Sequence, residues 1–355
     1  MTATAIAPST APSAGVVLEV TDLTKVFGQL AAVDHLTFTV QPARVTGFLG
    51  PNGAGKTTTM RMLLGLVAPT SGTALIGGHR YRDLPNPMRV VGSALEATNF
   101  HPGRSGRDHL RVLADASGIP TRRVDEMLDL VGIPAAARQR AGGYSMGMRQ
   151  RLGLAAALLG DPAVLMLDEP ANGLDPEGIR WLRSFLRHLA HQGKTILVSS
   201  HMLAEADQIV DDVVIIANGR SVAQGSMAEL RGEPTVFARS SDNAALASAL
   251  TARGVLSTAS DGGLIARTAD PARVGDIALA AGLPIHELHP LASDLEDLFF
   301  RLTDTPENRN RNLGGDMGAG TGPGGPPPWQ PPPPNAGPQP QPMLPVVSPE
   351  AGDPR

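Results

Sequence analysis

Hydrophobic residues occur along this chain in two patterns that predict different elements. Continuous apolar runs at 44–49, 163–167, 195–198 and 213–217 are typical of buried strands, which pack other elements on both faces. Apolar residues at helical spacing occupy 58–64, 106–116, 122–131 and 148–159. Buried strands interspersed with helices predict an α/β domain, and the section from about 95 to 160 should be a mostly helical insert.

Shorter strands are predicted on both sides of these segments. Residues 16–20 and 36–40 are expected to be strands joined by a turn around Gly28, with a further short strand near 74–76. The segments 213–217 and 221–224 flank Asn218-Gly219, a pair that favours a tight hairpin turn. We expect this hairpin to close the large domain near Gly232.

After Gly232 the order of elements changes. The pattern predicts, in order, a strand, a helix, two strands joined at Gly262-Gly263, a helix, a strand and a final helix. These segments are 235–239, 244–253, the two strands around 262–263, 271–281, 285–288 and 292–302. Their order suits a small α+β module with a ferredoxin-like connection.

Composition sets the expected domain limits. Past Asp304 lie 15 of the 32 prolines, among Gly, Asn and Gln, which predicts a disordered tail with polyproline II stretches. The tail could dock on a proline-reading domain or be passive. We therefore predict a disordered leader at 1–15, a large domain at 16–232, a small α+β module at 233–304 and a disordered tail at 305–355.

Charge and composition exclude several classes of function. A net charge of −4 gives no basic excess, which argues against nucleic acid as the main partner. The absence of cysteine excludes a disulfide scaffold and thiol catalysis. The first residues lack the features of a signal peptide, and the apolar clusters are too short to span a membrane. We expect a soluble chain or one held at a membrane by another protein.

The strongest candidate for chemistry is a glycine-rich loop between a predicted strand and a predicted helix. It follows the pattern Gly, four residues, Gly-Lys-Thr, in which glycines let several backbone N–H groups point at one anion. Lys56 would lie along the β- and γ-phosphates of a nucleotide, and the Thr57 hydroxyl would be a Mg²⁺ ligand. The loop comprises Gly50, Pro51, Asn52, Gly53, Ala54, Gly55, Lys56, Thr57 and Thr58.

The choice of lysine in this loop strengthens the interpretation. Of 30 basic residues only Lys25, Lys56 and Lys194 are lysine, so the chain uses arginine almost everywhere else. A compact ammonium fits between phosphates where a planar guanidinium would not. The exception at Lys56 therefore indicates a chemical requirement.

Polar residues end two further predicted strands. Asp168 and Glu169 follow 163–167, and His201 follows 195–200. Since α/β sheets bind ligands at the carboxyl ends of their strands, Asp168 is a candidate for Mg²⁺, directly or through water. Glu169 is a candidate for polarising the attacking water. His201 could reach a terminal phosphate, or it could simply cap the next helix.

Two other positions have both a functional and a structural interpretation. Phe27 could stack on a nucleobase, or it could be an ordinary core or surface aromatic. Ser145 lies in a small polar turn that opens a helix and is expected to be its N-cap. With Gly147 beside it, the same helix N-terminus could instead form a second anion site.

In this order the motifs resemble the ATP-binding subunit of ABC transporters over about 17–302, and they look closest to bacitracin- and daunorubicin-type drug exporters. Residues 50–58 are similar to the family's Walker A and 165–169 to its Walker B with catalytic glutamate. Residues 172–175 resemble the D-loop, which includes Asp175. Residues 144–148 align with the Leu-Ser-Gly-Gly-Gln signature. Tyr144 replaces its Leu, Met146 its first Gly and Met148 its Gln.

The resemblance assigns roles and partners. It implies that His201 is the switch histidine, that Phe27 stacks on adenine, and that Ser145 and Gly147 contact phosphate. It implies a P-loop cassette with a mixed core sheet and a helical subdomain, and ATP and Mg²⁺ as cofactors. Its partners would be a transmembrane permease and, in a head-to-tail dimer, a second ATP-binding subunit. The assembly would work at the cytoplasmic face of the cell membrane.

One position departs from the common pattern of the family. Glu96 stands where most relatives carry the glutamine that senses Mg²⁺ and the membrane partner, and the same departure occurs in the drug-exporter branch. We therefore count Glu96 as a third candidate metal ligand beside Thr57 and Asp168.

Two functions compete on this resemblance. The first is an ATPase that drives export of a drug, lipid or peptide, and the second is a soluble ABC ATPase acting on ribosomes or DNA. The translation type usually has two cassettes and the repair type long coiled-coil insertions, whereas this chain has one cassette and neither insertion. A sensor that does not hydrolyse ATP would be expected to lack Glu169 or His201. The sequence therefore favours export.

Overall fold

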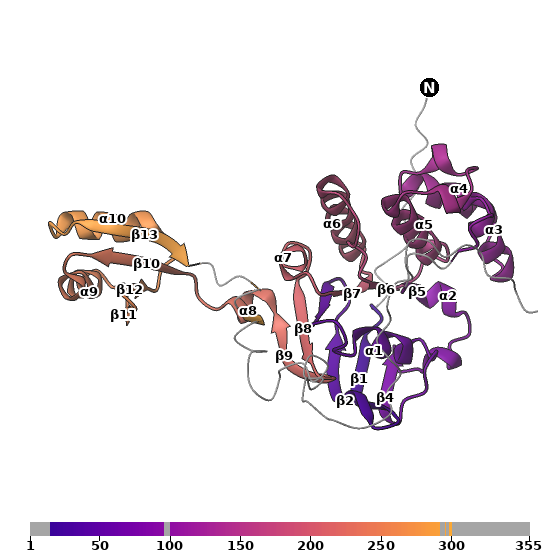
Figure 1. Ribbon diagram of the computed structural model, residues 1–355, viewed down its shortest axis with the longest axis horizontal. Coiled ribbons are helices and arrows are strands. Elements are labelled where there is room, and N and C mark those ends of the chain that lie inside the picture. Colours follow the sequence, from indigo (N-terminus) through magenta and orange to yellow (C-terminus); the bar gives the residue numbers. More distant parts are fainter. Residues whose placement is uncertain (1–14, 96–99, 292–294, 296–297, 300–355) are drawn as a thin grey trace, which may run out of the picture. The chain divides into compact units, whose positions relative to one another are not determined.

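A six-stranded, mostly parallel sheet forms the centre of the large domain in the computed structural model (Figure 1). The structure describes residues 15–95, 100–291, 295, 298 and 299. Five neighbouring strands run parallel and the last is antiparallel to its neighbour, which is the mixed core sheet that was predicted. In spatial order the strands are β5 (Val91–Ala94), β6 (Val164–Asp168), β7 (Thr195–Ser200), β3 (Val45–Leu49), β8 (Asp212–Ala217) and β9 (Arg220–Ser226).

A second, antiparallel sheet packs against the first. Its order is β2 (Leu30–Val40), β1 (Leu18–Phe27) and β4 (Ser71–Ile76), so the predicted strands exist but are longer. The rings of Phe38 and Phe48, one from each sheet, stack with their centroids 5.1 Å apart. Helix α1 (Lys56–Leu63) contributes Met60 and Leu63 to the same core. This core holds the first helical turn after the glycine-rich loop in place.

The other side of the parallel sheet is covered by helices. Helices α3 (Gly106–Ala116), α4 (Arg122–Leu130) and α5 (Met146–Leu158) match the predicted segments to within two residues. Helix α6 (Pro176–His191) was not predicted, nor were β5 and the short helices α2 (Pro87–Val90) and α8 (Met227–Arg231). The short helix α7 (Leu203–Ala206) follows His201, where a helix was considered.

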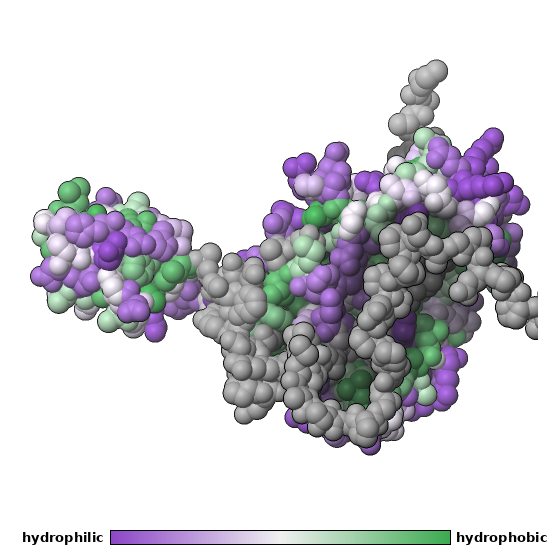
Figure 2. Space-filling model, viewed as in Figure 1, coloured by the Kyte–Doolittle hydropathy of each residue, from purple (hydrophilic) through white to green (hydrophobic). Residues whose placement is uncertain are grey.

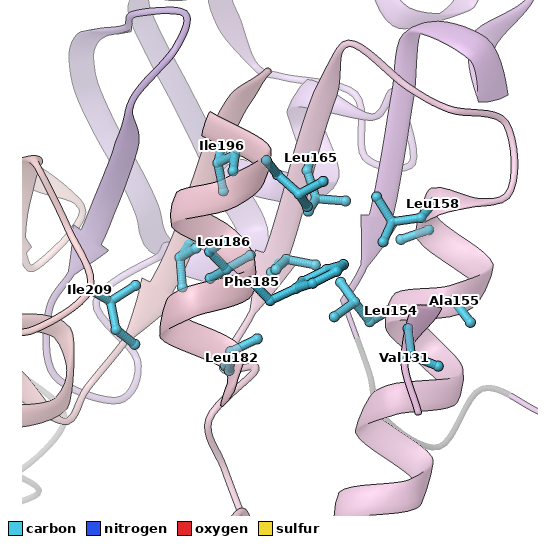
Figure 3. Close-up of a cluster of buried hydrophobic side chains, with 14 of the residues drawn as sticks. Val131, Leu154, Ala155, Leu158, Leu165, Leu182, Phe185, Leu186, Ile196 and Ile209 are labelled. Carbon is cyan, nitrogen blue, oxygen red and sulfur yellow. The ribbon is translucent and has the colours of Figure 1, made fainter. Parts of the chain in front are cut away.

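Helix α6 has a clear apolar face toward the sheet. Figure 3 shows its side chains Leu182, Phe185 and Leu186 among those of Leu165 from β6, Ile196 from β7 and Leu154 and Leu158 from α5. The surface over α3, α4 and α6 is mostly hydrophilic in Figure 2. In the described part of the chain, no helix has the length and apolar character needed to cross a membrane.

The hairpin of β8 and β9 forms as predicted. Asn218 and Gly219 both have positive φ, 50° and 81°, as a type I′ turn requires. The Gly219 N–H donates to the carbonyl of Ala54 at 3.1 Å, and the Asp34 N–H donates to the carbonyl of Gly219 at 2.9 Å. The hairpin turn therefore supports the glycine-rich loop directly.

The C-terminal module has the predicted ferredoxin-like connection and a core of its own. Its sheet order is β11-β12-β10-β13. Its elements are β10 (Thr235–Ser240), α9 (Asn243–Ala252), β11 (Ser257–Ser260), β12 (Gly263–Ala266), α10 (Pro271–Ala280) and β13 (Ile285–Leu291).

The helix predicted at 292–302 is described at three positions only, Leu295, Leu298 and Phe299, and all three are helical. Leu295 and Phe299 are buried in the core of the large domain, and Leu298 packs against it. The leader predicted at 1–15 and the tail predicted at 305–355 lie outside the described residues, apart from Gly15.

Candidate nucleotide site

Three strands deliver the candidate residues to one edge of the parallel sheet. The loop 50–58 follows β3, Asp168 ends β6, and His201 follows β7. Strand β7 lies between β6 and β3 and pairs with both in parallel. The carboxyl ends of all three strands therefore meet at the edge where α/β sheets bind ligands.

The glycines of the loop are required by its backbone. Gly53 and Gly55 have φ of 82° and 103°, a region that residues with a side chain rarely adopt. A Cβ at Gly50 would lie 2.4 Å from the carbonyl oxygen of Ile216, and one at Gly55 would lie 2.4 Å from that of Ala32. Gly55 is the N-cap of α1 and has no side chain to cap it, so the N-terminal N–H groups of α1 face the loop.

Lys56 is the buried cation of the site, with a side chain that is 6% exposed. Its Nζ donates to the carbonyl oxygens of Gly50 at 2.7 Å and Pro51 at 3.3 Å, and lies 3.5 Å from Oε1 of Glu169. Burial lowers the pKa of Lys56, while the charge of Glu169 opposes this shift. The ammonium is thus held inside the loop, where anions of a nucleotide would meet it.

Asp168 accepts a hydrogen bond on each carboxylate oxygen. The Thr57 hydroxyl donates to Oδ2 at 2.7 Å, and the Ser199 hydroxyl donates to Oδ1 over a short distance. A hydroxyl and a carboxylate this close are the hard oxygen donors that Mg²⁺ prefers, usually with phosphates and water completing its shell. The described residues contain no group of three His, Cys, Asp or Glu that could hold a metal without such help. Thr57 and Asp168 therefore fit Mg²⁺ bound with a nucleotide.

Glu169 is fixed by contacts at both ends of the residue. Its φ is 50°, and its backbone N–H donates to the Ser199 hydroxyl at 2.9 Å. Its Oε2 lies 2.8 Å from Nδ1 of His201, on the side opposite the contact of Oε1 with Lys56. A carboxylate held between a lysine and a histidine beside a phosphate loop is placed to accept a proton from water.

Other residues predicted for the site lie apart from this cluster. Phe27 ends β1 and is 50% exposed, with Nζ of Lys25 4.9 Å from its ring centroid, so it is a surface residue and not part of the core. Ser145 accepts a hydrogen bond from the Met148 N–H at 3.2 Å, which confirms it as the N-cap of α5. Asp175 is the N-cap of α6, accepting from the Gly178 N–H at 2.8 Å.

The segments similar to the signature and the D-loop pack together. The Met146 side chain lies over Gly173, and Leu174 lies beside Gly147. The Gln150 side chain also donates to the carbonyl of Asn172 at 3.3 Å. Gly147 is thus brought next to the D-loop of its own chain. Glu96 falls outside the described residues.

Ser199 was not predicted as a site residue, although it contacts both Asp168 and Glu169. Only a weak signal in the sequence points to Ser199: it is a residue with a hydroxyl group in a fully buried strand, two residues before His201. A buried hydroxyl needs a hydrogen-bond partner, but the sequence does not say which residue provides it.

The chain is similar to several known proteins. The family model described as ABC transporter matches residues 33–172, and one described as a domain of unknown function matches 234–296. The chain is 44% identical over 207 residues to the bacitracin transport ATP-binding protein of Bacillus licheniformis, covering 58% of this chain and 68% of the relative.

Two further matches extend this result. The chain is 37% identical over 219 residues to the Nod factor export ATP-binding protein I of Cupriavidus metallidurans, covering 60% of this chain and 72% of the relative. A solved structure of an ATP binding subunit of an ABC transporter matches with a TM-score of 0.56 at 31% identity, covering 61% of this chain and 92% of that chain.

Proposed function

Because the chain belongs to the ABC transporter family, as an ATP-binding subunit, we propose that the cluster around Lys56 binds ATP and that Glu169 and His201 catalyse its hydrolysis. The chain is an ATPase that powers export through a separate membrane subunit. The observation that carries the residue assignments is the contact of Glu169 with Lys56 on one side and His201 on the other, at 3.5 and 2.8 Å.

Each residue has a distinct role in this proposal. The loop N–H groups and Lys56 would bind the phosphates, and Thr57 and Asp168 would hold Mg²⁺, which would supply charge neutralisation. Glu169 accepts a proton from the attacking water, and His201 keeps the carboxylate of Glu169 oriented through its Nδ1. Glu96 is proposed as a further metal ligand, and Phe27 as the residue that stacks on adenine.

The complete site is proposed to need a second ATP-binding subunit. Ser145, Gly147 and Asp175 lie on a surface formed by the starts of α5 and α6, which contact each other through Met146 and Gly173. In a head-to-tail dimer this surface would close over the nucleotide held by the loop of the partner. A second copy of this chain is the simplest such partner.

The proposed location is the cytoplasmic face of the cell membrane, bound to a transmembrane permease. The relatives are named for the transport of bacitracin and the export of Nod factor, so related ATP-binding subunits serve different cargoes. A drug, a lipid or a peptide therefore all fit as the exported substrate.

Co-purification tests the export function. The tagged chain would be co-expressed with its neighbouring reading frames, purified in detergent, and tested for a bound membrane protein and for Mg²⁺-dependent ATPase activity. We expect the membrane protein to be retained and to change the ATPase rate. Lys56→Ala should retain the membrane protein without hydrolysis. An active chain that never retains a membrane partner would contradict the export function.

A further inference from the structure

Ser199 links the two carboxylate residues of the site, and we propose that it is a positioning residue that orients Asp168 toward Mg²⁺ and holds Glu169 for proton transfer. This role rests on the proposed function of Asp168 and Glu169 in ATP hydrolysis. Ser199 itself is fully buried in β7 and is not expected to touch the nucleotide.

The register of the sheet places Ser199 where it can reach both residues. Ser199 pairs with Asp168 across the β6–β7 ladder and with Phe48 across the β3–β7 ladder. Its hydroxyl donates to Oδ1 of Asp168 and accepts from the N–H of Glu169, at 2.9 Å for the second bond. One hydroxyl has one hydrogen and two lone pairs, so it can make both bonds at once.

The two hydroxyl groups that bind Asp168 are not equivalent. Thr57 donates to Oδ2 at 2.7 Å but is itself a candidate metal ligand, so its hydroxyl would be shared between Asp168 and the metal. Ser199 lies on the neighbouring strand and would continue to hold Oδ1. The terminal torsion of an aspartate is soft, so its carboxylate direction depends on such a partner.

Ser199 also supports the backbone of Glu169. With φ at 50°, Glu169 is in the left-handed region, which is unfavourable for a residue with a Cβ. The bond from its N–H to Ser199 stabilises this conformation at the point where the chain leaves β6. His201 fixes the other end of Glu169 through Oε2. Loss of Ser199 would therefore loosen the aspartate and the glutamate together.

Thr195 offers a matched control on the same strand. It is also fully buried, and its hydroxyl donates to the carbonyl of Val16 at 2.5 Å, at the end of β7 away from the loop. Thr195→Val removes a buried hydroxyl bond from β7 without touching Asp168 or Glu169. It separates a loss of stability from a loss of positioning.

The test compares Ser199→Ala, Ser199→Cys and Thr195→Val with the wild-type full chain. Binding of a fluorescent ATP analogue would be titrated with and without Mg²⁺, and ATPase rates and melting temperatures would be measured on the same samples. Ser199→Cys fills the site with a slightly larger side chain that donates only weakly, so it shows whether an unfilled space explains the effect of Ser199→Ala.

We expect both Ser199 variants to bind the analogue like wild type without metal. The gain in affinity for the analogue on adding Mg²⁺ should fall by about tenfold, as for other residues that orient metal ligands. The kcat should also fall by at least about tenfold, with a smaller change in KM. Thr195→Val should lose thermal stability but keep the Mg²⁺ gain and kcat.

Two results would overturn the role of Ser199. One is a Ser199→Cys or Ser199→Ala variant that keeps both the Mg²⁺ gain and kcat. The other is a set of losses in the Ser199 variants that Thr195→Val reproduces. A wild-type chain that neither binds nor hydrolyses ATP would contradict the proposed function instead, so the two failures are distinguishable.

Discussion

At the scale of single residues, Lys56 and Glu169 form a charged pair within the proposed site. Lys56 is almost fully buried, and its ammonium is satisfied by the carbonyl groups of its own loop and by Glu169. A nucleotide phosphate carries a negative charge and would compete with these neutral carbonyls for the ammonium. The contact with His201 would still orient Glu169 once a phosphate has engaged Lys56.

Substitutions of Lys56 and Glu169 should separate binding from catalysis. Lys56→Ala should remove ATP binding, because it deletes the buried cation of the loop. Glu169→Gln should keep binding, lower turnover by at least about 100-fold and favour an ATP-held dimer. Nucleotide titration and size-exclusion chromatography measure both effects. Unchanged ATPase activity in Glu169→Gln would remove that residue from catalysis.

Glu96→Gln tests the departure from the family pattern. A glutamate adds a full negative charge beside Mg²⁺, whereas a glutamine offers only a neutral oxygen, so the substituted chain should need more metal for half-maximal rate. We expect it to stay folded and active at saturating Mg²⁺. The measurement is a Mg²⁺ titration at fixed ATP. Superimposable curves would exclude a metal role and leave only coupling to the membrane partner.

At the scale of elements, α6 joins the helical side of the domain to the central sheet. Asp175 caps its N-terminus, and Pro176 occupies its first turn. Trp181 stacks on Phe185 with the ring centroids 5.2 Å apart, and the guanidinium of Arg151 from α5 lies 4.1 Å from the Trp181 ring centroid. The beginnings of α5 and α6, which carry Ser145 and Asp175, are therefore coupled by packing.

Phe185→Ala should destabilise the large domain strongly. Phe185 is buried between α6, the sheet and α5, so truncation should cost about 3–5 kcal/mol of unfolding free energy. Arg180→Ala, on an exposed position of the same helix, is the control and should cost less than about 0.5 kcal/mol. Urea unfolding followed by circular dichroism measures both. Equal midpoints for the two variants would contradict the anchoring role of α6.

At the scale of the whole molecule, the chain returns to the large domain after the C-terminal module. The module has its own core, yet Leu295 and Phe299, which follow it, belong to the core of the large domain. The large domain is therefore completed by residues from beyond the module. The composition after Asp304 offers no comparable apolar surface to bury.

Two truncations should have different effects for this reason. Deleting Pro306–Arg355 should leave the melting temperature and the ATPase rate unchanged. Deleting everything after Leu291 also removes Leu295 and Phe299, and burial of each such side chain stabilises by about 1.5–3 kcal/mol. That shorter chain should melt several degrees lower. A clear drop after the first deletion would mean that the tail packs on the large domain.

The sequence by itself determined the features that depend on neighbouring residues. The glycine pattern of 50–58, the Asn218-Gly219 turn and the cap at Ser145 all form as predicted, because backbone dihedrals and local hydrogen bonds specify them. The order of predicted elements after Gly232 was likewise sufficient to predict the ferredoxin-like connection of the C-terminal module. Helix α6 carries similar local signals in Asp175, Pro176 and its apolar spacing, but it was not predicted.

Only the tertiary structure decided which distant residues meet. The order β6-β7-β3 brings Ser199 beside Asp168, and Lys56 beside Glu169. These pairs are separated by 31 and 113 positions, and parallel strands can be ordered in several ways that leave every local pattern unchanged. The burial of Leu295 and Phe299 in the large domain depends equally on packing at a distance. Strand order and side-chain packing therefore set the geometry of the site, because no local pattern encodes them.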